Sequence, residues 1–175
     1  MNGEEKKDIQ VLILDLDGTL LRSQFNFTCY RQKKRCVICH FDESPHHPVC
    51  LHFRPYLEAF FSWCQEQNYQ LIIWSAIDME RLYVKVKAIE EKFGLKFHAY
   101  LSKEDMLEYK KQIEVILDKC KLKAEQVLAI DDESRHYTKN IDKCIYIKPW
   151  KEKDEADQEL VDVREKISQH FKQSK

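Results

Sequence analysis

The segment 11–20, VLILDLDGTL, constrains the fold of this chain more than any other. Four apolar residues run directly into Asp15, and Asp17 follows one residue later. An uninterrupted apolar run of this kind predicts a strand buried on both faces of a parallel sheet, with helices covering each face. In such sheets ligands bind outside the carboxyl ends of the strands. Asp15 and Asp17 are therefore predicted to lie at the functional edge of an α/β fold.

Two carboxylates on the same side of an extended backbone repel each other unless a cation or a proton lies between them. Mg²⁺ suits oxygen ligands and keeps coordination positions for water or phosphate oxygens. The alternative is a solvated Asp-x-Asp-Gly turn that ends a strand and binds nothing. The segment alone leaves both interpretations open.

The chain has 175 residues, of which 43% are hydrophobic and 11% aromatic, so we expect a single domain over 1–175 with a sizeable core. A net charge of −1 gives no general attraction to nucleic acid or to an anionic membrane. No apolar run is long enough to cross a membrane, and the N-terminal residues MNGEEKKD lack an apolar signal core. We expect a monomer in the cytoplasm or nucleus, whose seven cysteines are reduced thiols or metal ligands.

Hydrophobic patterning predicts strands that alternate with helices. Strands are expected at 9–15, 70–75, 97–101, 127–131 and 144–147, and helices at 54–68, 78–93, 103–120 and 152–171. This order is typical of a doubly wound α/β fold with a parallel sheet. The segment 21–53 interrupts it with turn formers and no helical period, so we expect a small β-hairpin insert there.

Three of the apolar runs end in polar residues, which are Asp15, Ser75, and Asp131 with Asp132. The carboxyl ends of parallel strands meet at one edge of the sheet, so these side chains should converge. Each ending alone has a structural alternative. Ser75 would cap a helix or form an ST-turn, and Asp131 and Asp132 would cap the helix that begins near residue 134. Together the three endings predict a functional site.

The DLDGTL segment, followed by these strand ends in the same order, resembles the haloacid dehalogenase superfamily of phosphatases over most of the chain. The resemblance implies that Asp15 is a nucleophile toward phosphorus and that Asp17 is the general acid and base. It implies a Mg²⁺ site made by Asp15, Asp131, the backbone carbonyl of Asp17, and Asp132 as a further ligand. Ser75 resembles the hydroxyl that hydrogen-bonds the transferring phosphoryl group.

The resemblance also implies a phosphate-binding lysine in the helix before the last acidic strand. Lys111, within YKKQIEVIL, fits best because Lys-x-Ile resembles the Lys-Asp-Leu of relatives, and Lys110 is the runner-up. The structural alternative for either lysine is a solvated helix face. With these groups the implied reaction is Mg²⁺-dependent hydrolysis of a phosphate ester through an aspartyl-phosphate.

The insert is too short for the helical lid of many relatives, which implies an open site and a phosphate carried on a macromolecule. FRPYLEAFF at 53–61 and WSA at 74–76 resemble the FCP/SCP-like phosphatases, which act on phosphoserine in the carboxyl-terminal repeats of RNA polymerase II. We therefore expect a phosphoserine or phosphothreonine protein substrate. The DGT and DDES segments depart from that subgroup. The alternatives are a nucleic-acid end phosphatase or small-molecule phosphatase of this fold, or a catalytically degenerate module that binds phosphopeptides.

The insert also contains CVICH at 36–40 and HHPVCLH at 46–52. Cys36, Cys39, His46 or His47, and Cys50 offer a tetrahedral set for Zn²⁺, which would stabilise a small β-insert. Buried cysteines and surface histidines in a hairpin are the alternative. The basic run RQKKR would contact an acidic phosphopeptide or RNA, or else form a solvated loop.

Overall fold

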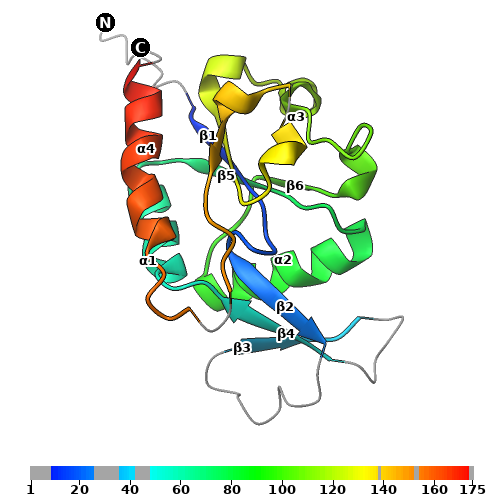
Figure 1. The fold of residues 1–175 in the computed structure, drawn as a ribbon. Helices are drawn as coiled ribbons and strands as arrows, with labels where there is room; N and C mark the ends of the chain where they lie inside the picture. Colours follow the sequence, from blue (N-terminus) through cyan, green and yellow to red (C-terminus); the bar gives the residue numbers. More distant parts are fainter. Residues whose placement is uncertain (1–8, 26–35, 42–47, 138, 152–153, 174–175) are drawn as a thin grey trace, which may run out of the picture.

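The computed structural model describes residues 9–25, 36–41, 48–137, 139–151 and 154–173. Its centre is a parallel sheet of five strands in the order β6-β5-β1-β7-β8 (Figure 1). The strands are β1 (Val11–Leu14), β5 (Gln70–Trp74), β6 (Ala99–Leu101), β7 (Val127–Asp131) and β8 (Cys144–Tyr146). The chain proceeds from β1 through β5 to one edge and then crosses to β7 and β8, so the strand order reverses between β1 and β7. The predicted α/β fold with a parallel sheet is confirmed.

Helices cover both faces of the sheet. Alternate residues of β1 point to opposite faces, so each set packs against different helices. Leu12 and Leu14 belong to the core shared with α1 (Leu57–Glu66), α2 (Met79–Phe93) and α4 (Glu159–Gln173). Val11 and Ile13 belong to the core shared with α3 (Ile113–Cys120). All of these β1 side chains are fully buried, which explains the absence of a polar residue before Asp15.

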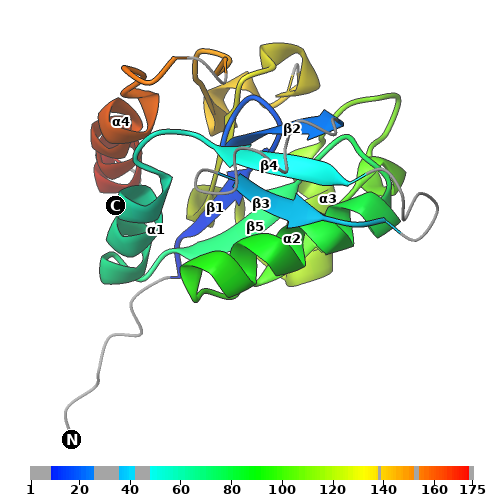
Figure 2. The ribbon, with the colours of Figure 1, turned by 90° about the horizontal axis from the view of Figure 1, so that it is seen from below.

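Between β1 and α1 the described residues form a three-stranded antiparallel sheet, where a hairpin was predicted. Its order is β2-β4-β3, with β2 (Leu21–Phe25), β3 (Cys36–Cys39) and β4 (Val49–Phe53). Figures 1 and 2 show this insert sheet beyond the end of β1 and beside α2. One face packs on the core through Leu21, Val49 and Leu51. The described part of the insert contains no helix, as predicted.

The helix predicted over 103–120 is wrong in its first half. A short 3₁₀ turn occupies Lys103–Asp105, and α3 begins only at Ile113. The break could not be predicted from the sequence, because the segment contains neither glycine nor proline. The terminal helix also begins later than predicted, at Glu159. No helix within the described ranges has both the length and the apolar character needed to cross a membrane.

A tight turn accounts for the break. Leu107 and Lys110 exchange backbone hydrogen bonds of 3.0 and 2.9 Å. Glu108 and Tyr109 between them both have positive φ angles, of 50° and 60°. A residue with a side chain adopts that conformation at a cost of about 1 kcal/mol, so tertiary contacts must hold the turn in place. Lys111 follows the turn and therefore lies ahead of α3, outside the helix.

One buried arginine joins the insert to the loop after β1 and to the C-terminal segment. Nε and Nη2 of Arg54 each donate to a carboxylate oxygen of Asp157 at 2.7 Å. Nη1 donates to the carbonyl oxygens of Gly18 and Thr19 at 3.2 and 3.0 Å, and Nη2 also donates to that of Lys148 at 2.7 Å. Every N–H of the guanidinium is used, so this buried charge is compensated.

We expect Arg54→Met to lower the free energy of unfolding by about 3–5 kcal/mol, because it leaves a buried carboxylate at Asp157 without its cation. Urea unfolding followed by circular dichroism measures the change. The double variant Arg54→Met/Asp157→Leu should lose less than Arg54→Met alone, since no unpaired charge remains. A loss below about 1 kcal/mol in Arg54→Met would contradict this role.

Candidate active site

Three carboxylates converge where the strand order reverses. Asp15 directly follows β1 and Asp131 ends β7, and the backbone N–H of Asp15 donates to the carbonyl oxygen of Ile130 at 3.1 Å. Asp132 is the next residue after β7. Oxygens of Asp15, Asp131 and Asp132 all lie within 4.8 Å of one another. The structure therefore brings together the carboxylates that the strand ends predicted.

A buried lysine lies between two of these carboxylates. Lys111 Nζ donates to Asp15 Oδ1 and to Asp131 Oδ2, both at 2.6 Å, and its side chain is fully buried. Lys110 instead donates to the backbone carbonyl oxygen of Arg135 at 2.8 Å. Of the two candidate lysines, the structure brings Lys111 to the cluster. The prediction that Lys111 lies in a helix is wrong, since Lys111 reaches the site from the segment ahead of α3.

The charges of this cluster do not balance, because three carboxylates face one ammonium group and leave two negative charges uncompensated. Burial raises the pKa of Asp15 to about 7. Lys111 opposes this rise, and the charges of Asp131 and Asp132 add to it. Burial likewise raises the pKa of Asp132. Without a further cation, Asp15 therefore takes up a proton far more readily than an exposed aspartate does.

Asp131 and Lys111 stay charged more easily. Burial alone would raise the pKa of Asp131, but His136, whose Nδ1 lies 3.4 Å from Oδ2, and Lys111 together lower it. The backbone N–H of Glu133 adds a hydrogen bond of 2.7 Å to Asp131 Oδ1. Burial opposes the charge of Lys111, yet its pKa is raised because Asp15 and Asp131 both contact it. His136 was missed in the sequence, where nothing distinguishes it from a surface histidine.

The donor set fits a hard divalent cation. Carboxylate oxygens are the ligands that Mg²⁺ prefers, and one Mg²⁺ would balance the uncompensated charge. Asp15, Asp131 and Asp132 would hold it, as the sequence predicted. The side chain of Asp17 is not part of this group, which leaves the predicted role of its backbone carbonyl as a prediction.

The loop after β1 fixes the position of Asp132. Gly18 has a φ of 98°, and a Cβ at this position would overlap the Asp132 carboxylate, so only glycine fits. Thr19 Oγ1 donates to Asp132 Oδ1 at 2.8 Å and accepts the Asp132 backbone N–H at 3.0 Å. The DGT and DDES segments, which depart from the FCP/SCP-like pattern, are therefore in direct contact through Thr19 and Asp132. Thr19 was missed in the sequence, although it lies within the DLDGTL segment.

Asp17 lies beside the cluster, and two residues that the sequence analysis missed bind its side chain. Ser23 Oγ donates to Asp17 Oδ1 and Lys85 Nζ donates to Oδ2, each at 2.6 Å. Lys85 belongs to α2 and is 5% exposed, whereas the Asp17 side chain is 31% exposed and reaches solvent. The sequence contained a pattern that indicates a buried role for Lys85, because this residue interrupts the apolar stripe formed by Leu82 and Val86.

Ser75 lies at the same edge of the sheet, directly after β5, which pairs with β1 on the side opposite β7. It is buried, and its backbone N–H donates to the carbonyl oxygen of Leu101 at 3.0 Å. The capping interpretation of Ser75 is wrong, because Asp78 caps α2 by accepting the N–H of Arg81. Its predicted contact with a phosphoryl group stays a prediction.

The model of the family described as NLI interacting factor-like phosphatase matches residues 10–175. The chain belongs to this phosphatase family. The predicted membership of the haloacid dehalogenase superfamily, in its FCP/SCP-like group, is thereby confirmed. A comparison with curated proteins finds no match.

Two solved structures show the same fold. The first is a variant of fission yeast RNA polymerase II CTD phosphatase Fcp1 bound to beryllium fluoride, with a TM-score of 0.67 and 18% identity over 95% of this chain and 52% of that chain. The second is Fcp1 described as an essential RNA polymerase II CTD phosphatase, with a TM-score of 0.66 and 19% identity over 93% and 51%. The chain spans about half the length of those Fcp1 chains.

The residues predicted to bind zinc are not all brought together. Cys36 and Cys50 lie close to each other on one face of the insert sheet, in a group that includes His52. Cys39 points to the opposite face, because residues three apart in a strand do so, and it packs in the core. His46 and the basic run fall outside the described residues. The proposed pairing of Cys36 with Cys39 is therefore wrong, and His52 was missed.

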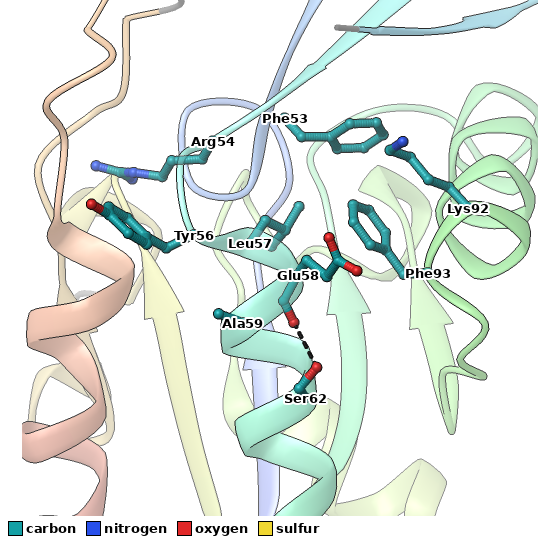
Figure 3. A pocket seen from close by; sticks show the side chains of 9 residues that line it. All are labelled: Phe53, Arg54, Tyr56, Leu57, Glu58, Ala59, Ser62, Lys92 and Phe93. Atoms are coloured by element: carbon teal, nitrogen blue, oxygen red, sulfur yellow. Dashed lines mark hydrogen bonds between the residues drawn. The ribbon is translucent and has the colours of Figure 1, made fainter. Parts of the chain in front are cut away.

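A hollow of about 490 Å³ lies between the start of α1 and the end of α2, and no residue of the carboxylate cluster lines it. Figure 3 shows Phe53, Lys92 and Phe93 on one side of it and Arg54 pointing away from them. Its polar groups are partly used internally, since Ser62 Oγ donates to the Glu58 carbonyl oxygen at 3.0 Å. Its lining residues include no group of metal ligands, so we place the candidate active site at the carboxylates.

We expect Mg²⁺ to raise the melting temperature of the chain more at about pH 8 than at about pH 5. Because the folded-state pKa of Asp15 is raised to about 7, its protonation stabilises the metal-free fold at low pH. That contribution is complete below the pKa of the unfolded chain and is lost as pH rises through about 7. Above that value Mg²⁺ no longer competes with a proton for Asp15.

Thermal unfolding at both pH values, with and without Mg²⁺, measures the effect. In Asp15→Asn, which cannot ionise, the Mg²⁺-induced shift should be smaller and should vary less with pH. Equal shifts at both pH values in the natural chain would contradict the assignment of Asp15 as a metal ligand.

Proposed function

We propose that this chain is a Mg²⁺-dependent phosphatase that acts through an aspartyl-phosphate on phosphoserine or phosphothreonine of a protein. The observation that carries the proposal is the position of Lys111 between Asp15 and Asp131, beside the further carboxylate of Asp132. This arrangement supplies an anionic nucleophile, a fixed cation for phosphate oxygens and a set of metal ligands in one place. Membership of a phosphatase family supports the same chemistry.

In the first step Asp15 attacks phosphorus, and the bond between phosphorus and the leaving oxygen breaks. Lys111 neutralises phosphoryl oxygens, and the Ser75 hydroxyl donates a hydrogen bond to them. Asp17, in its protonated form, gives its proton to the leaving oxygen, and Ser23 and Lys85 then hold the carboxylate that results. When bound, Mg²⁺ supplies the charge that offsets repulsion between the nucleophile and the phosphate dianion.

In the second step Asp17, now a carboxylate, accepts a proton from water, and that water attacks phosphorus. The bond between phosphorus and the Asp15 oxygen breaks, which regenerates the carboxylate and releases phosphate. Asp17 ends the cycle protonated, ready to donate to the next leaving group. Its partial exposure, 31% for the side chain, suits a group that must reach both a leaving group and solvent water.

A substrate carried on a protein is supported by the absence of a helical lid in the described part of the insert. The likeness to Fcp1 structures described as RNA polymerase II CTD phosphatases points in the same direction. A substrate of this kind would place the protein in the nucleus, and a cytoplasmic phosphoprotein is the alternative.

We expect Asp15→Asn to abolish Mg²⁺-dependent hydrolysis of para-nitrophenyl phosphate, because an amide is too weak a nucleophile to attack phosphorus. The matched control is Asp118→Asn, the same change at an exposed position of α3, which should keep full activity. Retained turnover in Asp15→Asn would exclude the aspartyl-phosphate route. A folded natural chain without turnover would instead favour the phosphopeptide-binding module.

We expect kcat/KM for a phosphoserine peptide to exceed the values for oligonucleotides with 3′- or 5′-phosphate and for sugar phosphates. An open edge of the sheet favours a substrate that extends beyond its phosphate over a sugar phosphate. A net charge of −1 gives the chain no general attraction to an oligonucleotide. Steady-state kinetics with equal Mg²⁺ measure all of these substrates. A higher kcat/KM for an oligonucleotide or a sugar phosphate would replace the protein substrate with that class.

A further inference from the structure

Two cysteines and a histidine share one face of the insert sheet. β3 pairs with β4 so that Cys36 lies opposite His52 and Ile38 lies opposite Cys50. Directly opposed residues of antiparallel strands project to the same face, and so do residues two apart along a strand. Cys36, Cys50 and His52 therefore project together, and their ligand atoms lie within 4.8 Å of one another.

This face is turned away from the one that packs on the core through Val49 and Leu51. Cys50 is nevertheless fully buried and His52 is 6% exposed, while Cys36 is partly exposed. Two thiolates and a neutral imidazole are ligands that Zn²⁺ prefers. A Zn²⁺ ion bound by them carries no net charge, so it suits a buried position where a charged group would be strongly destabilised.

We propose that Cys36, Cys50 and His52 bind a structural Zn²⁺ in the reduced chain. With Zn–S bonds of about 2.3 Å and Zn–N bonds of about 2.0 Å, tetrahedral geometry separates ligand atoms by roughly 3.5–3.8 Å. The ligand atoms of Cys36, Cys50 and His52, which lie within 4.8 Å of one another, need to move only slightly closer to reach that spacing. The site is separate from the carboxylate cluster and lies outside the proposed reaction.

Cys50 is in a disulfide in the structure and Cys36 is not, so the expectation of reduced thiols or metal ligands is wrong for Cys50. Reduction of the Cys50 disulfide therefore precedes metal binding. A thiol reductant supplies two electrons and two protons, the S–S bond breaks to give two thiols, and the reductant is oxidised to its own disulfide. Zn²⁺ then displaces the protons of the Cys36 and Cys50 thiols to solvent, and His52 binds as the neutral imidazole. Thiols are the stable form in the reducing compartments expected for this chain.

The metal would fix β3 to β4, and β4 pairs along its length with β2. A metal bound between the strands of so small a sheet contributes directly to its folding free energy. β2 carries Ser23, which bonds Asp17. The zinc would thus stabilise the strands that support the active site without entering the chemistry.

The test is the zinc content of the chain purified with a thiol reductant, measured by inductively coupled plasma mass spectrometry. We expect about one zinc per chain, and a loss of most of it in Cys36→Ser and in His52→Gln. Cys39→Ala is the matched control, because Cys39 lies on the opposite face and its loss should leave the zinc content unchanged. A reduced natural chain without zinc, or unchanged zinc in both ligand variants, would overturn the proposal.

A second measurement covers variants that fail to fold. Co²⁺ replaces Zn²⁺ in the reduced natural chain, with excess Mg²⁺ present to occupy the carboxylate cluster. We expect the absorption bands of tetrahedral Co²⁺ together with thiolate-to-metal charge transfer. A spectrum of octahedral Co²⁺ without charge transfer would overturn the site regardless of the behaviour of any variant.

Discussion

The mutual repulsion of Asp15, Asp131 and Asp132 is the constraint on which the rest of this structure depends. Parallel pairing of β1 with β7 places these carboxylates side by side, and burial strengthens their repulsion. Lys111 offsets part of it through contacts of 2.6 Å to two of them. Glu108 and Tyr109, in the turn before Lys111, adopt the left-handed conformation, and this turn positions the ammonium group of Lys111. The charge that remains suits a divalent cation, so the same imbalance that destabilises the metal-free chain prepares it to bind Mg²⁺.

A second set of contacts keeps the loop after β1 in the shape that the cluster needs. The backbone N–H of Trp150 donates to the Gly18 carbonyl oxygen at 2.8 Å, and Arg54 donates to the same oxygen. Gly18 in turn leaves room for Asp132, and Thr19 bonds it. The FRP segment therefore stabilises the loop after β1 through the buried guanidinium of Arg54. In the described structure Arg54 does not contact Asp15, Asp131 or Asp132.

The sequence predicted what depends on local patterns and missed what depends on tertiary contacts. The apolar runs ending at Asp15 and Asp131 predicted the central strands and the edge where their polar residues meet. A strand buried on both faces contains only apolar residues, so its polar residues come at its end. The break before α3 was missed because it is imposed by contacts of the segment with the rest of the fold, against a helical pattern. Likewise, Cys-x₂-Cys spacing could not reveal that Cys39 faces the core. That result depends on strand pairing, which the spacing of cysteines does not encode.

The two faces of the insert sheet separate two kinds of chemistry. Ser23 lies opposite Leu51, so it shares the face that packs on the core and reaches Asp17. Cys50 lies next to Leu51 in β4 and therefore projects from the other face. The carboxylates offer oxygen ligands to a hard cation, and the proposed zinc ligands offer sulfur and nitrogen, so each site selects its own metal by ligand type. Because β4 carries residues of both faces, a slip in its pairing with β2 by one residue would exchange them. The register of β4 against β2 thus decides whether Ser23 can hold Asp17, and its register against β3 decides whether Cys36 can meet Cys50 and His52.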